Sequence, residues 1–512
     1  MALALFAPLA HSEDNSVHVH LAQGDLRGIS LDSGVSAFLG VPYAAPPIGD
    51  LRWRSPAPAP IWQGTRDASA FGARCMQPSG SQEYGPWTHE FVAHERVSED
   101  CLYLNVWTPV HAAGVRLPIL FWIHGGGFTS GSGAVDIYNG EAFARHSGVI
   151  VISVNYRLGV FGFFSHPGLS SEGMNGNQAG YDLVAALQWV QKNAVAFGGD
   201  PARVTIAGQS GGGAAVNALI ISPLARGLFA GAIIQSFPIG VLPSSVSLAT
   251  AQEAGTSLAS ALHATSLAEL RAVSPEQIQA KAGRTFGYPT CACFFVDGGF
   301  LTEEPSQAFA QRRQSDVPTM VGIVDAESPF PTTAAGYATG IAGRYGVHSA
   351  EFLQLYPAST NAEAMTQALL SGRERLLVGM DRWAVTRAKT SRTPIFLYLF
   401  DHTEPGPNSA QYGAFHTAEV PYVFGTLGAA PERGFTEADR VISRTMMAYW
   451  ENFVRTGDPN GKGLPRWRHA TGRRPSPVME LGDRWTPLPS IPDAHRAFLD
   501  RYFDGGGYPF LF

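Results

Sequence analysis

Short apolar runs that alternate with helical segments restrict the fold of this chain more than any other feature. Residues 119–123, 149–154 and 204–207 are nearly continuous apolar or β-branched runs. Such runs indicate strands that are buried on both faces, as in parallel sheets. Apolar residues at helical spacing lie in residues 178–197 and 214–221. This order of elements predicts an α/β fold around a large, mixed and mostly parallel sheet that is flanked by helices.

Weaker patterns extend this arrangement toward both ends of the chain. Residues 17–21 and 26–30 are separated by a turn that contains glycine, so they predict an N-terminal hairpin. Further strand candidates lie at residues 319–324, 394–400 and 478–481. These later strands continue the pattern of the first half less clearly.

The domain organisation is interpreted as one large domain, from residue 17 to residue 512. The segments 240–290 and 330–390 are mainly helical, and we expect them to be insertions that cover one end of the sheet. Residues 1–16 include an apolar run with no Lys or Arg before it. They are interpreted either as a signal-peptide remnant or as a disordered extension.

Charge and hydropathy exclude two classes of partner. Lys and Arg number 36 against 42 Asp and Glu, which gives a net charge of -6 and no electrostatic basis for binding nucleic acid. No segment approaches about 18 uninterrupted apolar residues, so no membrane span is expected. The hydrophobic fraction of 45% and the charged fraction of 15% indicate a large core. The oligomeric state stays open.

The four cysteines form two pairs that differ in their ability to form a disulfide. Cys75 and Cys101 would close a loop of about 25 residues if bridged, a stabilisation of about 3 kcal/mol, or they are two buried thiols. Cys291 and Cys293 are separated by one residue, so a bridge between them would be strained. We interpret this second pair as free thiols, and no metal ligands lie nearby in the sequence.

A Gly-x-Ser-x-Gly motif at residues 208–212 marks a candidate nucleophile, Ser210. The motif alone is a weak signal in a chain with 57 glycines. Its context is specific, because a buried strand ends directly before it and a helix follows. A sharp strand-to-helix turn projects the hydroxyl above the sheet, and Gly208 and Gly212 allow the backbones to approach closely.

A second glycine-rich segment supplies candidate donors for an oxyanion. His124-Gly125-Gly126-Gly127 follows the strand candidate at residues 119–123. Backbone N–H groups of such a loop, together with the N–H of the residue after the nucleophile, stabilise the tetrahedral intermediate of acyl transfer. Gly211 has the latter position.

A serine nucleophile also needs a base and an acid, which follow it in that fold in the order Ser, acid, His. His416 lies in a polar loop after the strand candidate at residues 394–400, where a base is expected. Asp325 and Glu327 both follow the strand candidate at residues 319–324. Chain order does not distinguish these two acids.

Several longer motifs occur in a fixed order over nearly the whole chain. They are residues 98–106 (SEDCLYLNV), 124–128, 155–157, 197–201, 208–213, 416–425 and 457–460. With these motifs the chain resembles the type-B carboxylesterases, the cholinesterase-like branch of the α/β hydrolases. The resemblance implies an α/β-hydrolase fold, one catalytic domain, and helical insertions that form a gorge over the active site.

The resemblance also implies roles for individual residues. It selects Glu327 rather than Asp325 as the acid of a triad with Ser210 and His416. The other implied assignments are Gly126, Gly127 and Gly211 as oxyanion donors, a Cys75–Cys101 disulfide, an Arg52–Glu99 ion pair and a supporting position for Ser236 near Glu327. The disulfide favours a secreted or periplasmic location over a cytoplasmic one.

Two departures from the cholinesterase pattern concern the substrate. Gln209 stands where cholinesterases carry a glutamate, and Phe91 stands at about the position of their choline-binding tryptophan, with Trp87 close by. Phenylalanine is the weaker cation–π partner, so neutral or anionic esters are favoured over choline esters. The candidate pocket residues are Phe91, Phe128, Gln209, Cys293 and Phe294.

The resulting prediction is a serine carboxylesterase that converts a small-molecule ester to acid and alcohol through an acyl-enzyme on Ser210. It needs no metal and no organic cofactor. One alternative is a lipase-like esterase for longer acyl chains. A second alternative is a non-catalytic adhesion protein of the same fold, although such proteins typically lack a member of the triad, which is complete here.

Overall fold

The computed structural model describes residues 15–78, 83–111, 114–237, 246–285, 294–328 and 332–507. Its strands are β1 (Ser16–Leu21), β2 (Gly24–Ser30), β3 (Val35–Pro42), β4 (Thr65–Asp67), β5 (Tyr103–Pro109), β6 (Leu117–Ile123), β7 (Ile150–Val154), β8 (Gly199–Gln209), β9 (Gly231–Gln235), β10 (Thr319–Val324), β11 (Ile395–Phe400) and β12 (Val478–Leu481). Its helices are α1 (Glu141–Ser147), α2 (Gly159–Phe163), α3 (Pro167–Ser171), α4 (Gln178–Asn193), α5 (Gly211–Ile221), α6 (Leu248–Ala261), α7 (Leu267–Ala272), α8 (Pro275–Thr285), α9 (Pro305–Ala310), α10 (Ala334–Tyr345), α11 (Ser349–Leu355), α12 (Asn361–Ala388), α13 (Ser409–Tyr412), α14 (Val420–Phe424), α15 (Glu437–Thr456) and α16 (Asp493–Asp504).

The strands of the described residues join in one sheet, in the order β1-β2-β3-β5-β7-β6-β8-β9-β10-β11-β12, with β4 beside β2. From β7 to β12 all neighbours in this order run parallel. The neighbours from β1 to β7 run antiparallel. The expected mixed and mostly parallel sheet is therefore confirmed, with its parallel part formed by β6 to β12.

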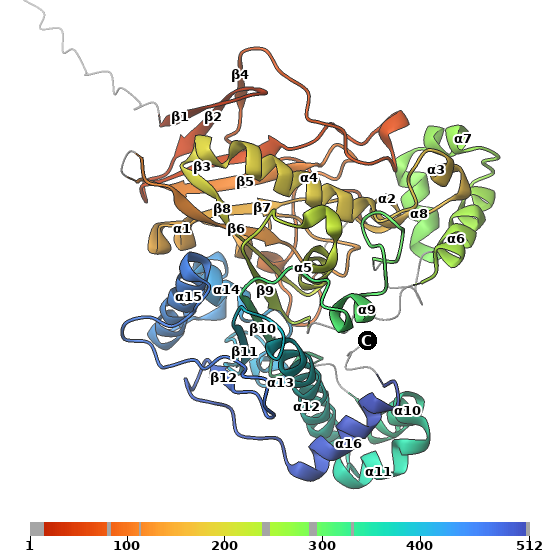
Figure 1. Ribbon diagram of the computed structural model, residues 1–512, viewed down its shortest axis with the longest axis vertical. Helices are drawn as coiled ribbons and strands as arrows, with labels where there is room; N and C mark the ends of the chain where they lie inside the picture. The colour runs from red at the N-terminus through yellow and green to blue at the C-terminus, as the bar shows by residue number, and fades with distance from the viewer. Residues whose placement is uncertain are drawn as a thin grey trace, which may run out of the picture.

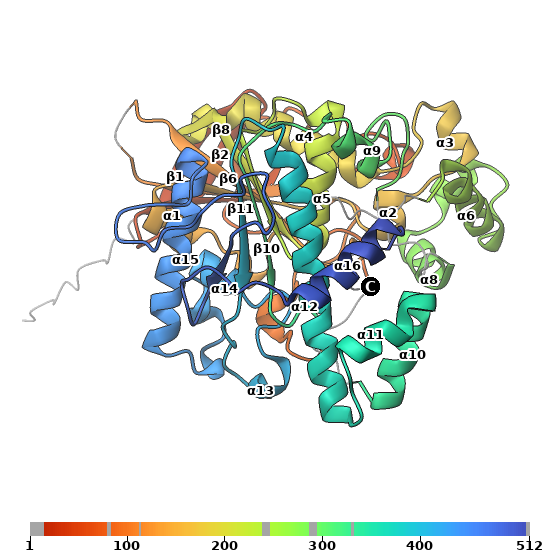
Figure 2. The ribbon, with the colours of Figure 1, turned by 60° about the horizontal axis from the view of Figure 1, so that its bottom comes forward.

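The sheet is buried on both faces, as the continuous apolar runs predict. Along β6, Ile119, Phe121 and Ile123 pack into one hydrophobic cluster, which also contains residues of α4, α5 and α12. Leu120 and Trp122 point to the opposite cluster, which contains residues of α1, α14 and α15. Figures 1 and 2 show these two sets of helices on opposite faces of the sheet.

The expected helical segments contain α6, α7 and α8 in one range and α10, α11 and α12 in the other. Both groups lie on the side of the molecule opposite β1 (Figures 1 and 2). Among the described helices, none combines the length and the apolar character that crossing a bilayer requires. The expected strands and the N-terminal hairpin are confirmed, whereas β3, β4, β5 and β9 lie where no strand was expected.

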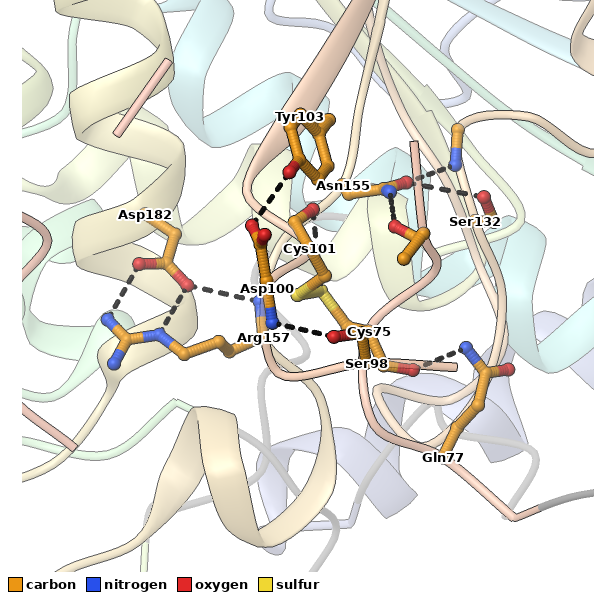
Figure 3. The surroundings of a disulfide bond; sticks show 12 residues. Cys75, Gln77, Ser98, Asp100, Cys101, Tyr103, Ser132, Asn155, Arg157 and Asp182 are labelled. Atoms are coloured by element: carbon orange, nitrogen blue, oxygen red, sulfur yellow. Dashed lines mark hydrogen bonds and ion pairs between the residues drawn. A yellow bond between two sulfur atoms is a disulfide. The ribbon is translucent and has the colours of Figure 1, made fainter. Parts of the chain in front are cut away.

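Cys75 and Cys101 form a disulfide, as the family resemblance implied (Figure 3). Both residues are buried. Gln77, two residues further on, is bonded to the backbone of Gly131 in both directions: its amide nitrogen donates to the Gly131 carbonyl at 2.9 Å and its amide oxygen accepts from the Gly131 N–H at 3.0 Å. The loop that the disulfide closes is thus tied to the segment that follows the glycine-rich residues 125–127.

The Arg52–Glu99 ion pair is also present. The Nε and Nη2 atoms of Arg52 each donate to one carboxylate oxygen of Glu99, both at 2.6 Å, and both side chains are buried. The remaining Nη1 donates to the carbonyls of Arg271 and Val273, which belong to the α7 region. This pair therefore connects the N-terminal part of the chain to the helices α6 to α8.

Candidate active site

Ser210 occupies the turn between β8 and α5. Its backbone has φ 56° and ψ -121°, a conformation that is strained for any residue with a side chain. Hydrogen bonds hold the turn on both sides: the Ser210 N–H donates to the carbonyl of Gln235 at the end of β9, and its carbonyl accepts from Ala214 in α5, both at 2.9 Å. A strained backbone that is fixed in this way keeps the side chain at the end of the sheet.

The glycines on either side of Ser210 are required by close backbone contacts. A Cβ atom at Gly212 would collide with the carbonyl oxygen of Ile123, the last residue of β6. A Cβ atom at Gly208 would lie 2.5 Å from the backbone of Gly212. The strands β6 and β8 and the start of α5 therefore meet at a distance that admits no side chain.

The glycine-rich loop after β6 lies against this turn. Gly126 and Gly127 have positive φ angles of 99° and 59°, and the N–H groups of Thr129 and Ser130 fold the loop back onto the Gly126 carbonyl at 3.0 and 3.1 Å. The Gly127 nitrogen lies 3.2 Å from the place where a Cβ of Gly211 would be. Within the described residues, no hydrogen bond uses the N–H groups of Gly126, Gly127 or Gly211. Three donors are therefore available to a bound group.

His416 and Glu327 are in direct contact. The Nδ1 atom of His416 lies 2.5 Å from Oε2 of Glu327, and Oε1 of Glu327 accepts the N–H of Val324 at 3.0 Å. The loops that carry the two side chains are joined by a hydrogen bond from the Ala326 N–H to the Ala414 carbonyl, also 3.0 Å. This backbone link sets the position of the histidine relative to the carboxylate.

Asp325, the other candidate acid, points elsewhere. Its carboxylate forms an ion pair with Arg373 of α12, and 38% of its side chain is exposed. Glu327 is 4% exposed. The geometry thus brings Glu327 rather than Asp325 to His416.

The surroundings of His416 determine its protonation. Burial lowers the pKa of the imidazole. The charge of Glu327 and its hydrogen bond raise the pKa by more than burial lowers it, so the pKa lies above its ordinary value of 6.5. The carboxylate at Nδ1 keeps the proton of the neutral ring on that atom and leaves Nε2 as an acceptor. The amide nitrogen of Gln209, which precedes Ser210, lies 3.2 Å from this Nε2 atom. The neighbour of Ser210 in the chain thus contacts the Nε2 side of His416 without adding a charge.

Ser236 lies at the end of β9, next to the turn of Ser210. It also has a positive φ, 53°, and its N–H donates to the carbonyl of Gly322 in β10 at 2.8 Å. Its hydroxyl is buried and makes no hydrogen bond within the described residues. Its expected supporting position near Glu327 therefore has no side-chain hydrogen bond behind it in the described part of the chain.

The candidate pocket residues fall into two groups. Phe128 and Phe294 lie together, with ring centroids 5.2 Å apart, and both are 2% exposed. Phe91 packs against the other hydrophobic cluster, with its ring 5.6 Å from that of Phe415, the residue before His416. Cys293 and its neighbour Cys291 lie outside the described residues.

Sequence reasoning missed Glu419, which is fully buried three residues after His416. One oxygen accepts the side-chain amide of Gln235 at 3.0 Å. Burial raises the pKa of Glu419 to about 7, and the nearby charge of Glu327 adds to this effect. An acidic residue in an otherwise apolar stretch, Ala418-Glu419-Val420-Pro421, was the signal that could have revealed it.

Comparison with known proteins shows the family of the chain. Residues 14–339 and 344–496 match the model of the carboxylesterase family. Fumonisin B1 esterase of Sphingopyxis macrogoltabida is 35% identical over 90% of this chain and 85% of its own length. Phenmedipham hydrolase of Pseudarthrobacter oxydans is 35% identical over 91% of this chain and 94% of its own length. Cocaine esterase of Homo sapiens is 33% identical over 85% of this chain and 82% of its own length.

The contact between Glu327 and His416 should determine how kcat/KM depends on pH. In Glu327→Gln the charge that raises the pKa of His416 is removed, and the effect of burial, which lowers it, prevails. A base must be neutral to accept a proton, so the acid limb of kcat/KM against pH should lie above pH 6.5 in the unmodified chain and move to lower pH in the variant. For p-nitrophenyl acetate we also expect kcat/KM to fall by about 10³- to 10⁴-fold.

Asp325→Asn is the matched control, because it removes the same charge two residues away. Its half-exposed ion pair with Arg373 contributes little, so kcat/KM should change by no more than about threefold. An equal loss in both variants, or an unmoved acid limb in Glu327→Gln, would contradict the pairing of Glu327 with His416.

Proposed function

The chain belongs to the carboxylesterase family of ester hydrolases, and we propose that it works through Ser210 as a nucleophile and an acyl-enzyme intermediate. The observation that carries this proposal is the shared location of three features. These are a strained serine at the start of α5, nearby N–H groups that make no hydrogen bond within the described residues, and the His416–Glu327 pair within reach of its neighbour Gln209.

Acylation begins when the Ser210 hydroxyl attacks the ester carbonyl carbon and His416 Nε2 takes its proton. The carbonyl oxygen becomes an oxyanion, which the N–H groups of Gly126, Gly127 and Gly211 stabilise. Glu327 stabilises the imidazolium that forms. The tetrahedral intermediate then expels the alcohol, which receives the proton from His416, and the acyl group remains on Ser210.

Deacylation repeats these steps with water. His416 Nε2 takes a proton from the water molecule as its oxygen attacks the acyl carbon, and the same three N–H groups stabilise the second oxyanion. Collapse of this intermediate breaks the bond to Ser210, whose oxygen recovers the proton from His416. The products are the carboxylic acid and free enzyme, and the atoms and charges balance without a cofactor.

The side chains of Gln209 and Phe91 support neutral or anionic esters as substrates, in preference to choline esters. Gln209 contributes an amide at the position closest to Ser210, and the phenyl ring of Phe91 already faces the guanidinium of Arg433 at 5.2 Å. A ring that faces one cation is poorly placed to bind a second one. The relatives are named for fumonisin B1, phenmedipham and cocaine, so the family does not itself select an ester.

The Cys75–Cys101 disulfide supports a secreted or periplasmic location, because such bonds persist in oxidising compartments and are rare in the cytosol.

Ser210→Ala tests the proposed nucleophile. The variant keeps the fold but lacks the attacking oxygen, so kcat for p-nitrophenyl acetate should fall by at least about 10⁴-fold. Ser236→Ala is the informative comparison, since Ser236 is the neighbouring serine with a positive φ at a strand end. If Ser236→Ala is the inactive variant, or if Ser210→Ala stays within tenfold of the unmodified chain, the nucleophile is not Ser210.

A pair of isosteric esters tests the substrate class. We expect the neutral 3,3-dimethylbutyl ester of an acid to have a kcat/KM at least equal to that of the choline ester of the same acid. Gln209→Glu places a negative charge beside the site and should shift the ratio toward the choline ester by about tenfold. A preference for the choline ester in the unmodified chain would contradict the assignment of neutral or anionic substrates.

A further inference from the structure

We propose that Trp87 is a positioning residue for His416, an inference that rests on the proposed role of His416 as the base. The indole Nε1–H of Trp87 donates to the backbone carbonyl of His416 at 2.9 Å, and the Thr417 hydroxyl oxygen lies 3.4 Å from the same nitrogen. Trp87 belongs to the loop that the Cys75–Cys101 disulfide closes. A side chain from the N-terminal part of the chain thus holds the backbone of the base directly.

The segment that carries His416 needs such support, because its backbone is irregular on both sides. Gly413 has φ 57° and Thr417 has φ 93°, a left-handed value that is unfavourable for a β-branched residue. On the Glu327 side the segment is held by the hydrogen bond from Ala326 to Ala414. Trp87 supplies the second attachment, on the other side of His416.

Aromatic contacts orient the Trp87 ring. It meets the ring of Phe415 edge to face at a centroid distance of 6.0 Å, and Tyr84 stacks on it at 6.5 Å with an interplanar angle of 12°. The turn between Tyr84 and Trp87 is closed by two backbone hydrogen bonds between these residues, of 3.0 and 3.1 Å. These contacts therefore fix the orientation of the indole independently of its hydrogen bond to His416.

A buried cation anchors this turn to the C-terminal half of the chain. Arg433, in the 3-10 helix Pro431–Arg433, donates through Nη2 to the carbonyl of Pro86 and to the hydroxyl of Thr88, both at 2.7 Å. Its Nε donates to the buried carboxylate of Glu90, and Glu404 lies 3.3 Å from the same atom. The residues on either side of Trp87 are thus fixed by a charged group that is itself 7% exposed.

A positioning role of Trp87 and a packing role of Trp87 have different effects on the pKa of His416. The charged groups that face His416 are Glu327 at Nδ1 and the more distant Glu419, both of which raise its pKa, while Gln209 faces Nε2 without a charge. Loss of the Trp87 hydrogen bond frees the His416 backbone, which lengthens the contact with Glu327 on average. The pKa of His416 then falls, whereas a loss of packing alone leaves it in place.

The experiment uses the full-length chain with its disulfide intact. Trp87→Phe keeps an aromatic ring against Phe415 but removes the donor. Trp62→Phe is the matched control, because the indole of Trp62 also donates to a backbone carbonyl, that of Asp25, at 2.9 Å but far from the site. The readouts are kcat, KM and the pH profile for p-nitrophenyl acetate, together with Tm.

We expect Trp87→Phe to lower kcat by about tenfold with KM changed by less than about twofold, and to move the acid limb of the profile to lower pH. Trp62→Phe should leave all three unchanged. Replacement of Trp87 by 3-benzothienylalanine, which has the size of tryptophan but lacks the N–H, should reproduce the effect of Trp87→Phe without lowering Tm.

Normal kcat and an unmoved acid limb in the benzothienyl variant would overturn the inference, as would an equal loss in Trp62→Phe. A fall in kcat that accompanies only a lower Tm, with no shift of the acid limb, would also overturn it. The proposed function is tested separately: His416→Ala and Ser210→Ala must be inactive. If they are inactive while Trp87 variants behave normally, only the role of Trp87 is wrong.

Discussion

The close backbone contact between β6, β8 and α5 is the constraint on which the candidate site depends. The carbonyl of Ile123 lies where a side chain of Gly212 would be, so the backbones at the end of β6 and at the start of α5 are in direct contact at the edge of the sheet. The glycine-rich loop that leaves β6 therefore passes directly beside Ser210; a Cβ at Gly125 would lie 3.3 Å from the Cβ of Ser210. The Gly127 nitrogen of this loop lies 3.2 Å from the place where a Cβ of Gly211, at the start of α5, would be, and neither N–H group makes a hydrogen bond within the described residues.

The strands that flank this contact were predictable because they are apolar on both faces, whereas four other strands, β3, β4, β5 and β9, were missed. β5 carries a polar residue that the fold buries in hydrogen bonds: Asn105 accepts the Gly40 N–H at 3.0 Å and donates to the hydroxyl of Ser153 at 3.0 Å. Such residues interrupt the apolar pattern while remaining inside the sheet.

The candidate site was predictable to the extent that its parts are local in sequence. Ser210 and its N–H donors follow from two short glycine-rich segments and the strands before them, and His416 follows from chain order. Asp325 and Glu327 could not be distinguished in this way, since both follow β10; the turn after the strand directs one to Arg373 and the other to His416. The contacts of His416 with Gln209 and Trp87 join residues 207 and 329 positions apart, so no local pattern reveals them.

The central claim is that Ser210 forms the covalent intermediate. Its most direct test is to label the intact chain with a fluorophosphonate, digest it and locate the adduct by mass spectrometry. The account predicts one adduct per chain, on the peptide that contains Ser210, and no labelling after His416→Ala has removed the base. An adduct on any other serine, or ester hydrolysis that continues in a chain whose Ser210 is fully labelled, would contradict it.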